Sequence, residues 1–260
     1  PRIVTSDTTE YQEGRTDTFW LVDLVELKTY QSEFELVLVT PHAYWYVENI
    51  LDISLSDIER SATVFEDVIY PVVTSIFGSE WTPGIDNDAH LNILNASLRG
   101  VAGYYNSVDE YPTSVNSKSN QREMIYVNAL DVHPGSNTYD QVLAHELQHA
   151  IHWYADTSED TWINEGLSEL SSSIALDSYL SISPFLKGSP VSLINWPTSS
   201  SGGIANYGSS SLFMHYFSEH YTGQDGLKAF VAQQEDGIAG VNAYLMESGY
   251  KAQFEDVFRQ

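Results

Sequence analysis

Residues 145–149 read His-Glu-Leu-Gln-His, and the interpretation of the whole chain starts from this stretch. Apolar residues recur at helical spacing on both sides of it, which predicts a helix over residues 139–154. His145 and His149 then lie one turn apart on one helix face, where two imidazole nitrogens can bind the same metal ion. The stretch therefore predicts a metal site in the middle of a helix.

Glu146 stands beside the first histidine, too near in sequence to bind the same ion comfortably but well placed to take a proton from metal-bound water. A catalytic zinc site needs a third protein ligand and one open position. The segment 162–169, Trp-Ile-Asn-Glu-Gly-Leu-Ser-Glu, supplies a carboxylate at Glu165. Its helical spacing and the polar turn 156–160 predict two helices that pack side by side and bring Glu165 to the histidines.

His-Glu-x-x-His followed by Asn-Glu-Gly resembles the gluzincin metallopeptidases, the thermolysin and aminopeptidase clan, and most closely the hyicolysin-type peptidases. The resemblance extends from about Ile85 to Tyr221. It implies an α+β, zincin-like fold with an N-terminal mixed or antiparallel β lobe, a central helix carrying the motif and a C-terminal helical lobe. It also implies a zinc-dependent peptidase with one Zn²⁺ per chain.

The resemblance further assigns roles to individual residues. His145, His149 and Glu165 are the implied zinc ligands, and Glu146 is the implied general base. Glu169, one turn beyond Glu165, matches an acidic residue that orients the first histidine of the clan. Thermolysin itself has a longer spacer before its glutamate ligand, so Glu169 is the alternative third ligand.

The metzincin zinc site does not fit the residues that follow the motif. That site requires glycine and histidine at the positions of His152 and Ala155. We expect His152 to be an exposed or core histidine and not a metal ligand.

A hydrogen-bond donor is needed for the oxyanion that forms when a peptide bond is hydrolysed. Asn-Tyr-Gly at 206–208 partly resembles the Tyr-x-x-Gly helix start from which aminopeptidase-like gluzincins present such a tyrosine. This predicts Tyr207 as the donor, with ordinary packing of its ring as the competing interpretation and His215 as the fallback donor.

The family's substrate lies extended along an edge strand. Residues 100–106, Gly-Val-Ala-Gly-Tyr-Tyr-Asn, occupy the corresponding place, and their two glycines allow close approach of a peptide. An internal strand weakened by glycine is the alternative. Aminopeptidases of the clan carry a glutamate in this strand, and since this chain has none, we expect an endopeptidase with a protein or peptide substrate.

The sequence before the motif predicts strands first and then a long helix. Residues 19–47 are rich in β-branched and aromatic residues and predict two or more strands. A helix is predicted from a capping box at Ser56–Glu59 to Gly78, with a kink at Pro71. Short strands are predicted at residues 91–95, 101–106 and 124–127.

A second capping box is predicted at Thr138 and Gln141, before the motif helix. Residues after Tyr139 mostly follow helical spacing. We divide the chain into an N-terminal β-rich segment (1–55), a sheet lobe with the long helix and the motif helix (56–154), and a helical lobe that supplies the third ligand (155–260).

Composition limits the classes of function. The 260 residues include 36 Asp plus Glu against 11 Lys plus Arg, a net charge of −25 that repels nucleic acid and anionic membranes. No apolar run reaches the roughly 18 residues of a membrane span. The chain has no Cys, which fits a cytosolic and an extracellular location equally well. It opens at Pro1 without an initiator Met, so we expect a secreted protein whose signal peptide is removed or trimmed.

Asp86-Asn-Asp88 offers oxygen ligands for Ca²⁺, although a turn is the favoured interpretation. Two functional classes compete with the peptidase. One is a non-catalytic, zinc-containing protein of the same fold that binds a peptide partner, against which the intact Glu146 argues. The other is zinc-dependent hydrolysis of a compound other than a peptide, which the sequence does not separate from proteolysis.

Overall fold

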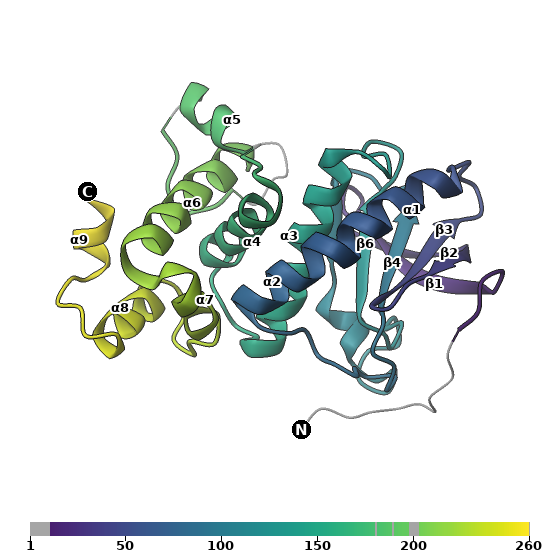
Figure 1. Cartoon of the computed structure of the whole chain (residues 1–260), viewed down its shortest axis with the longest axis horizontal. Helices are drawn as coiled ribbons and strands as arrows, with labels where there is room; N and C mark the ends of the chain where they lie inside the picture. Colours follow the sequence, from purple (N-terminus) through teal and green to yellow (C-terminus); the bar gives the residue numbers. More distant parts are fainter. Residues whose placement is uncertain (1–10, 180, 189, 198–202, 260) are drawn as a thin grey trace. The chain divides into compact units, whose positions relative to one another are not determined.

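The structure is a computed structural model that describes residues 11–179, 181–188, 190–197 and 203–259. It has the predicted α+β class, with a curled six-stranded sheet and several helices (Figure 1). The chain divides into two compact units, one of residues 1–71 and 81–150, the other of residues 72–80 and 151–260. The predicted boundaries after residues 55 and 154 stay predictions.

The first unit contains a mixed sheet in the order β1-β2-β3-β4-β6-β5. Its strands are β1 (Thr16–Asp23), β2 (Lys28–Val39), β3 (Ala43–Glu48), β4 (Leu91–Ala96), β5 (Gly103–Tyr105) and β6 (Met124–Asn128). The pairs β3–β4 and β4–β6 are parallel, and the other pairs are antiparallel. The strands predicted near residues 19–47, 91–95, 101–106 and 124–127 are thus confirmed, with three strands in the first of these regions.

Every residue of β3, β4 and β6 is buried, so the centre of the sheet is covered on both faces. Alternation along the strands directs Tyr46, Leu94 and Tyr126 into an aromatic core shared with β1 and β2. Trp45 points to the opposite face, where its ring meets Phe65 edge-on at 5.7 Å between centroids. Helices therefore cover one face of the sheet, and the curled outer strands cover the other.

The two edges of the sheet differ. On β1, the backbone N–H of Trp20 donates to Asn120 Oδ1 at 2.8 Å, and that of Val22 donates to the Tyr104 hydroxyl at 3.2 Å. Side chains thus satisfy part of the β1 edge. At the other end of the sheet, β5 pairs with β6 and with no further strand among the described residues.

The long helix predicted before Gly78 is present in three parts, α1 (Leu55–Val64), a π-helical turn η1 (Phe65–Ile69) and α2 (Tyr70–Phe77). The predicted capping box at Ser56 is wrong, because α1 begins at Leu55 and its N-cap is Ser54, two residues before Ser56. The π-helical turn comes shortly before Pro71, and the predicted kink at Pro71 stays a prediction. Pro71 has no N–H to donate, and the preceding turn widens so that Tyr70 N–H donates to Phe65 O.

Helix α3 (Asn137–Ala155) carries the His-Glu-Leu-Gln-His stretch, as predicted. It begins before the predicted capping box, because the Ser136 hydroxyl accepts a hydrogen bond from Tyr139 N at 3.3 Å and so acts as the cap. Two buried hydrogen bonds anchor its first turn. The Tyr139 hydroxyl donates to Asn95 Oδ1 on β4 at 2.7 Å, and the Ser61 hydroxyl donates to Asp140 Oδ1 at 2.5 Å.

The second unit is helical in its described residues. Its helices after α3 are α4 (Thr161–Leu176), α5 (Ile182–Lys187), α6 (Ile204–Phe217), the π-helical turn η3 (Ser218–Thr222), α7 (Gly223–Val231), α8 (Gly237–Glu247) and α9 (Phe254–Phe258). Trp162 at the start of α4 is 1% exposed and packs edge-on against Phe213 of α6 and Phe254 of α9. This aromatic cluster fixes the start of α4.

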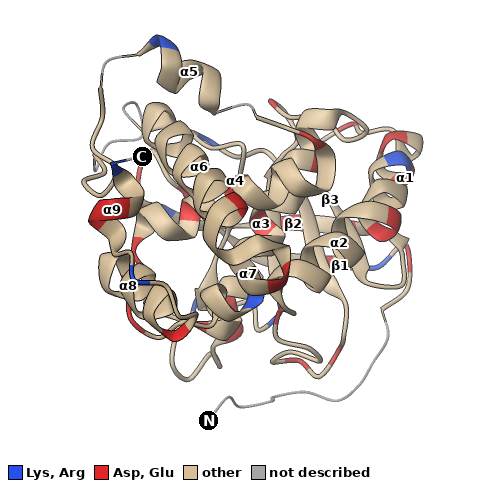
Figure 2. Cartoon of the chain, turned by 60° about the vertical axis from the view of Figure 1, so that its left-hand side comes forward, with Lys and Arg blue, Asp and Glu red and all other residues tan. Residues whose placement is uncertain are grey.

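Acidic residues occur on helices and loops throughout the chain, whereas basic residues are few (Figure 2). None of the helices in the described residues is both long enough and apolar enough to cross a membrane.

A buried carboxyl group in the first unit makes its stability depend on pH. Glu123 precedes β6, is 2% exposed, and accepts a hydrogen bond from Ile85 N at 2.8 Å. The pKa of Glu123 is raised to about 9, mainly because burial disfavours the charged carboxylate. The hydrogen bond from Ile85 N opposes this rise, and the nearby carboxyls of Glu110 and Asp86 contribute to it. The folded state therefore holds a proton at Glu123 that the unfolded chain releases near pH 4.5.

The free energy of unfolding should fall as pH rises from about 4.5 to about 9, because the unfolded state binds fewer protons in this range. Glu123→Gln keeps an oxygen acceptor for Ile85 and removes the titration. We expect this variant to melt at a higher temperature than the unaltered protein at pH 8 and to lose most of that advantage at pH 4.5. If the two proteins differ in melting temperature by the same amount at pH 8 and at pH 4.5, Glu123 is not the group that titrates.

Candidate metal centre

The predicted metal site rests on two helices joined by a short turn. α3 ends at Ala155 and α4 begins at Thr161, so the predicted turn 156–160 is confirmed. Apolar residues of α3 such as Leu143 and Leu147 are fully buried, while His145 and His149 are only half-buried. The periodicity of the helix thus separates its core face from the face that carries the two histidines.

His145, His149 and Glu165 form a group that could hold a metal ion. Each offers one ligand atom, and these atoms lie within 4.8 Å of one another. The two imidazole rings are 4.8 Å apart between centroids and inclined at 76°. Two imidazole nitrogens and one carboxylate oxygen form the donor set of several catalytic zinc sites, so these residues fit a zinc ion.

Glu146 follows the first histidine and is 6% exposed. Gly103 of β5 lies directly against it. A methyl group built at this glycine would be 3.4 Å from Glu146 Oε1, 2.5 Å from Val142 Cγ1 and 2.8 Å from the carbonyl oxygen of Tyr126. The glycine at this position therefore lets the edge strand β5 approach α3 beside the carboxylate of Glu146.

The Asn-Glu-Gly segment also depends on a close approach. A methyl group at Gly166 would be 2.8 Å from Met214 Cγ and 3.0 Å from Ser210 O, both on α6. The glycine after Glu165 therefore allows α4 and α6 to pack side by side (Figure 1).

Glu169 is absent from the group formed by His145, His149 and Glu165. Its Oε2 accepts a hydrogen bond from the Ser181 hydroxyl at 2.5 Å. The predicted role of Glu169 in orienting His145 stays a prediction.

Tyr207 lies in the first turns of α6, where its half-buried ring packs against Trp196 with 4.9 Å between centroids. The adjacent Gly208 has a packing role, because a methyl group there would be 2.3 Å from Ser181 O and 2.6 Å from Phe185 Cβ. The glycine that follows Tyr207 is thus explained by the contact between α5 and α6. The role of the Tyr207 hydroxyl stays a prediction.

His215, the fallback donor, is half-buried on α6, and burial lowers the pKa of its imidazole. Its Nε2 and the Ser173 hydroxyl are 2.9 Å apart, and its ring packs against Tyr179. Its described contacts lie with α4 and with the segment after α4.

A second group of ligand-type side chains was missed by the sequence interpretation. His152, Asp156 and Glu159 also place ligand atoms within 4.8 Å of one another. The pKa of Glu159 is raised to about 7, mainly by burial and in smaller part by the Asp156 and Asp236 carboxylates, while hydrogen bonds from Gly237 N and Asp160 N oppose the rise. The signal in the sequence was the helical spacing of His152 and Asp156, which continues the spacing of the motif histidines.

Asp86 and Asp88, the candidate calcium ligands, are not in either group found among the described residues. Asp86 Oδ1 accepts a hydrogen bond from Asp88 N at 3.1 Å, which forms the expected turn. Asp88 Oδ2 accepts a hydrogen bond from the Tyr44 hydroxyl, and Asp88 Oδ1 contacts His90. Calcium at this segment stays a prediction.

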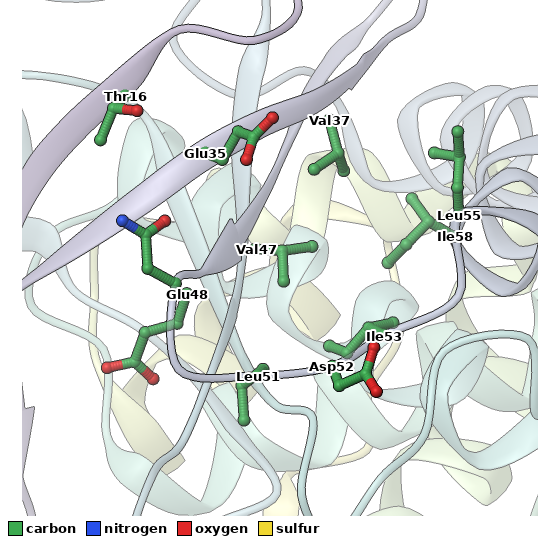
Figure 3. Close-up of a pocket in the computed structure, with 11 residues that line it drawn as sticks. Thr16, Glu35, Val37, Val47, Glu48, Leu51, Asp52, Ile53, Leu55 and Ile58 are labelled. Atoms are coloured by element: carbon green, nitrogen blue, oxygen red, sulfur yellow. The ribbon is translucent and has the colours of Figure 1, made fainter.

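A pocket of about 350 Å³ lies in the first unit and is separate from the metal groups. It is lined by residues of β1, β2, β3, the segment that leads into α1 and the first turn of α1. They combine carboxylates such as Glu35 and Asp52 with apolar side chains such as Val37 and Ile53 (Figure 3). None of the predicted site residues lines it.

Comparison with protein-family models found no match, and a comparison with curated proteins also found none. The assignment of the site therefore depends on its own residues and geometry.

The two glutamates of α4 can be distinguished by zinc affinity. We expect Glu165→Ala to weaken zinc binding at the His145–His149 site by more than about 100-fold, because a ligand is lost, and Glu169→Ala to weaken it by less, as for an outer hydrogen-bond partner. Competition with a chromogenic chelator measures both. A larger loss in Glu169→Ala would make Glu169 the third ligand.

Proposed function

We propose that this chain is a zinc-dependent peptidase with a zincin-like fold of the gluzincin type, and that it cuts peptide bonds within a chain. The observation that carries the proposal is the group of His145, His149 and Glu165, assembled from two helices beside the buried carboxylate of Glu146. When bound there, one zinc ion would polarise the substrate carbonyl and lower the pKa of a water molecule.

The protein supplies the proton transfer and the binding of the substrate. Glu146 would take the proton of the attacking water and pass it to the leaving amine, the usual work of a general base that then acts as an acid. The low exposure of Glu146 favours this role, because few water molecules compete for its carboxylate. We propose that the Tyr207 hydroxyl donates a hydrogen bond to the developing oxyanion.

An extended peptide would bind along β5. This strand pairs only with β6 among the described strands, and Gly103 brings it next to Glu146. Backbone hydrogen bonds to a strand edge hold a substrate by its main chain, which suits internal positions of a peptide. The described residues of β5, Gly-Tyr-Tyr, include no carboxylate that could bind a free amino terminus. This supports the endopeptidase over the aminopeptidase.

The net charge of −25 disfavours nucleic acid as a partner and suits a secreted protein. Secretion stays a prediction.

Glu146→Gln tests the enzymatic function. The exchange removes the base and leaves the ligands, so we expect cleavage of a mixed peptide library to fall by about 10²-fold or more while zinc content is unchanged. Glu59→Gln, an exposed exchange of the same charge on α1, is the matched control and should keep full activity. Mass spectrometry of the products identifies internal cuts, which should disappear when a chelator is added.

Two results would change the proposal. A Glu146→Gln variant with full activity would remove Glu146 from the mechanism. An unaltered protein that binds zinc and peptides but yields no chelator-sensitive cuts would instead favour a non-catalytic peptide-binding protein.

Tyr207→Phe removes one hydroxyl and keeps the ring that packs against Trp196. We expect kcat to fall by about 10²-fold with a much smaller change in KM, because the lost hydrogen bond is made in the transition state. Tyr250→Phe is the control, since it removes a hydroxyl that donates to Tyr221 O at 3.0 Å. Wild-type kcat together with a lowered melting temperature would show that Tyr207 is a packing residue.

A further inference from the structure

A second group of ligand-type residues lies at the C-terminal end of α3 and in the turn that follows. Asp156 N donates to His152 O at 2.7 Å, so helical geometry continues to Asp156 and brings these two side chains to the same side. Glu159 lies further along the turn, and its ligand atom is within 4.8 Å of those of His152 and Asp156. All three residues belong to the second compact unit.

The group is largely buried. His152 is 1% exposed and Asp156 is 7% exposed. Asp156 Oδ1 accepts hydrogen bonds from Ser158 N at 3.1 Å and from the Ser158 hydroxyl at 3.2 Å. Asp156 Oδ2 is also buried and accepts no hydrogen bond from any described residue. A buried carboxylate oxygen without a donor is costly, which indicates a ligand at this oxygen.

Negative charge also accumulates around the group. The Ser158 hydroxyl is 3.1 Å from Asp236 Oδ1, which places a third carboxylate beside Asp156 and Glu159. In the described part of the chain, no lysine or arginine forms an ion pair with any of these three carboxylates. Glu159 Oε1 accepts hydrogen bonds from Gly237 N at 2.8 Å and Asp160 N at 2.6 Å, which fixes the position of its carboxylate.

We propose that His152, Asp156 and Glu159 bind a second divalent cation of the zinc class, in a structural site distinct from the His145–His149 site. One imidazole nitrogen and two carboxylate oxygens are ligands that Zn²⁺ accepts. The imidazole disfavours Ca²⁺ and Mg²⁺, which prefer oxygen ligands throughout. Two of the three ligands are almost fully buried, which suits an ion that holds structure and does not meet a substrate.

The site would stabilise the turn between α3 and α4. His152 belongs to α3, whereas Asp156 and Glu159 belong to the turn, so one ion would cross-link the helix end to the residues that lead into α4. Binding to the folded state alone raises stability by mass action. This inference does not rest on the proposed peptidase function, because it concerns different ligands and needs no catalysis.

The test measures zinc in full-length protein from which the first site has been removed. We expect His145→Ala/His149→Ala to keep about one zinc per chain after reconstitution and dialysis. Adding Asp156→Asn should reduce the content to near zero, whereas adding Asp225→Asn, an exposed exchange of the same charge on α7, should leave it unchanged. A double variant that binds no zinc would overturn the proposal, as would equal zinc contents with Asp156→Asn and Asp225→Asn.

A second variant covers the case in which Asp156→Asn fails to fold. Glu159→Gln keeps the oxygen that accepts from Gly237 and Asp160 and loses the ligand charge. In the double-variant background, zinc at a hundredfold excess over its Kd should raise the melting temperature by about 5 °C or more. Glu159→Gln should abolish most of this shift, with circular dichroism of the metal-free protein unchanged. A shift of the same size in Glu159→Gln would contradict the assignment.

Discussion

Helix α3 must bury one face in the sheet unit while presenting the motif histidines from another, and the candidate site depends on this constraint. The hydrogen bonds of Tyr139 to Asn95 and of Ser61 to Asp140 hold the first turn of the helix by buried polar groups. Such bonds are directional, so they fix the rotation of the helix as well as its position. With that rotation set, Leu143 and Leu147 enter the core and His145 and His149 leave it. A rotated helix would carry the same residues without forming the site.

Glycines decide where other elements can approach. Gly103 allows β5 to lie against α3, and Gly166 allows α4 to lie against α6. In both places the space that a β-carbon would occupy is already filled by main-chain oxygen or by side-chain carbon. These two contacts locate the edge strand proposed to bind substrate and the helix that carries Glu165. These two glycines thus contribute to the proposed function because they lack a side chain, which leaves room for the neighbouring element.

Burying an ionised carboxylate costs free energy, and this chain can reduce that cost in three ways. Glu123 and Glu159 are buried enough for their pKa values to rise to about 9 and about 7, so a proton is one way to reduce the charge. Asp17 instead lies beside Arg15 and Arg122, and hydrogen bonding to Arg15 helps to lower its pKa. With 11 basic residues for 36 acidic ones, the chain cannot pair most of its carboxylates internally. A bound cation would be a third way, since both candidate metal groups include carboxylates that a cation would neutralise.

The sequence by itself determined the α+β class, most of the strands, the helix of residues 139–154 and the turn before α4, because periodicity and turn residues are local properties. It also predicted the set His145, His149 and Glu165 through spacing and resemblance. The capping residues were misplaced at Ser56 and Thr138, because the N-cap of α1 is Ser54 and the Ser136 hydroxyl caps α3. Only the tertiary structure brought Glu159 to His152 and Asp156, and Gly103 to Glu146. Those approaches depend on how a turn folds back and how a strand packs on a helix, and neither is encoded in local spacing.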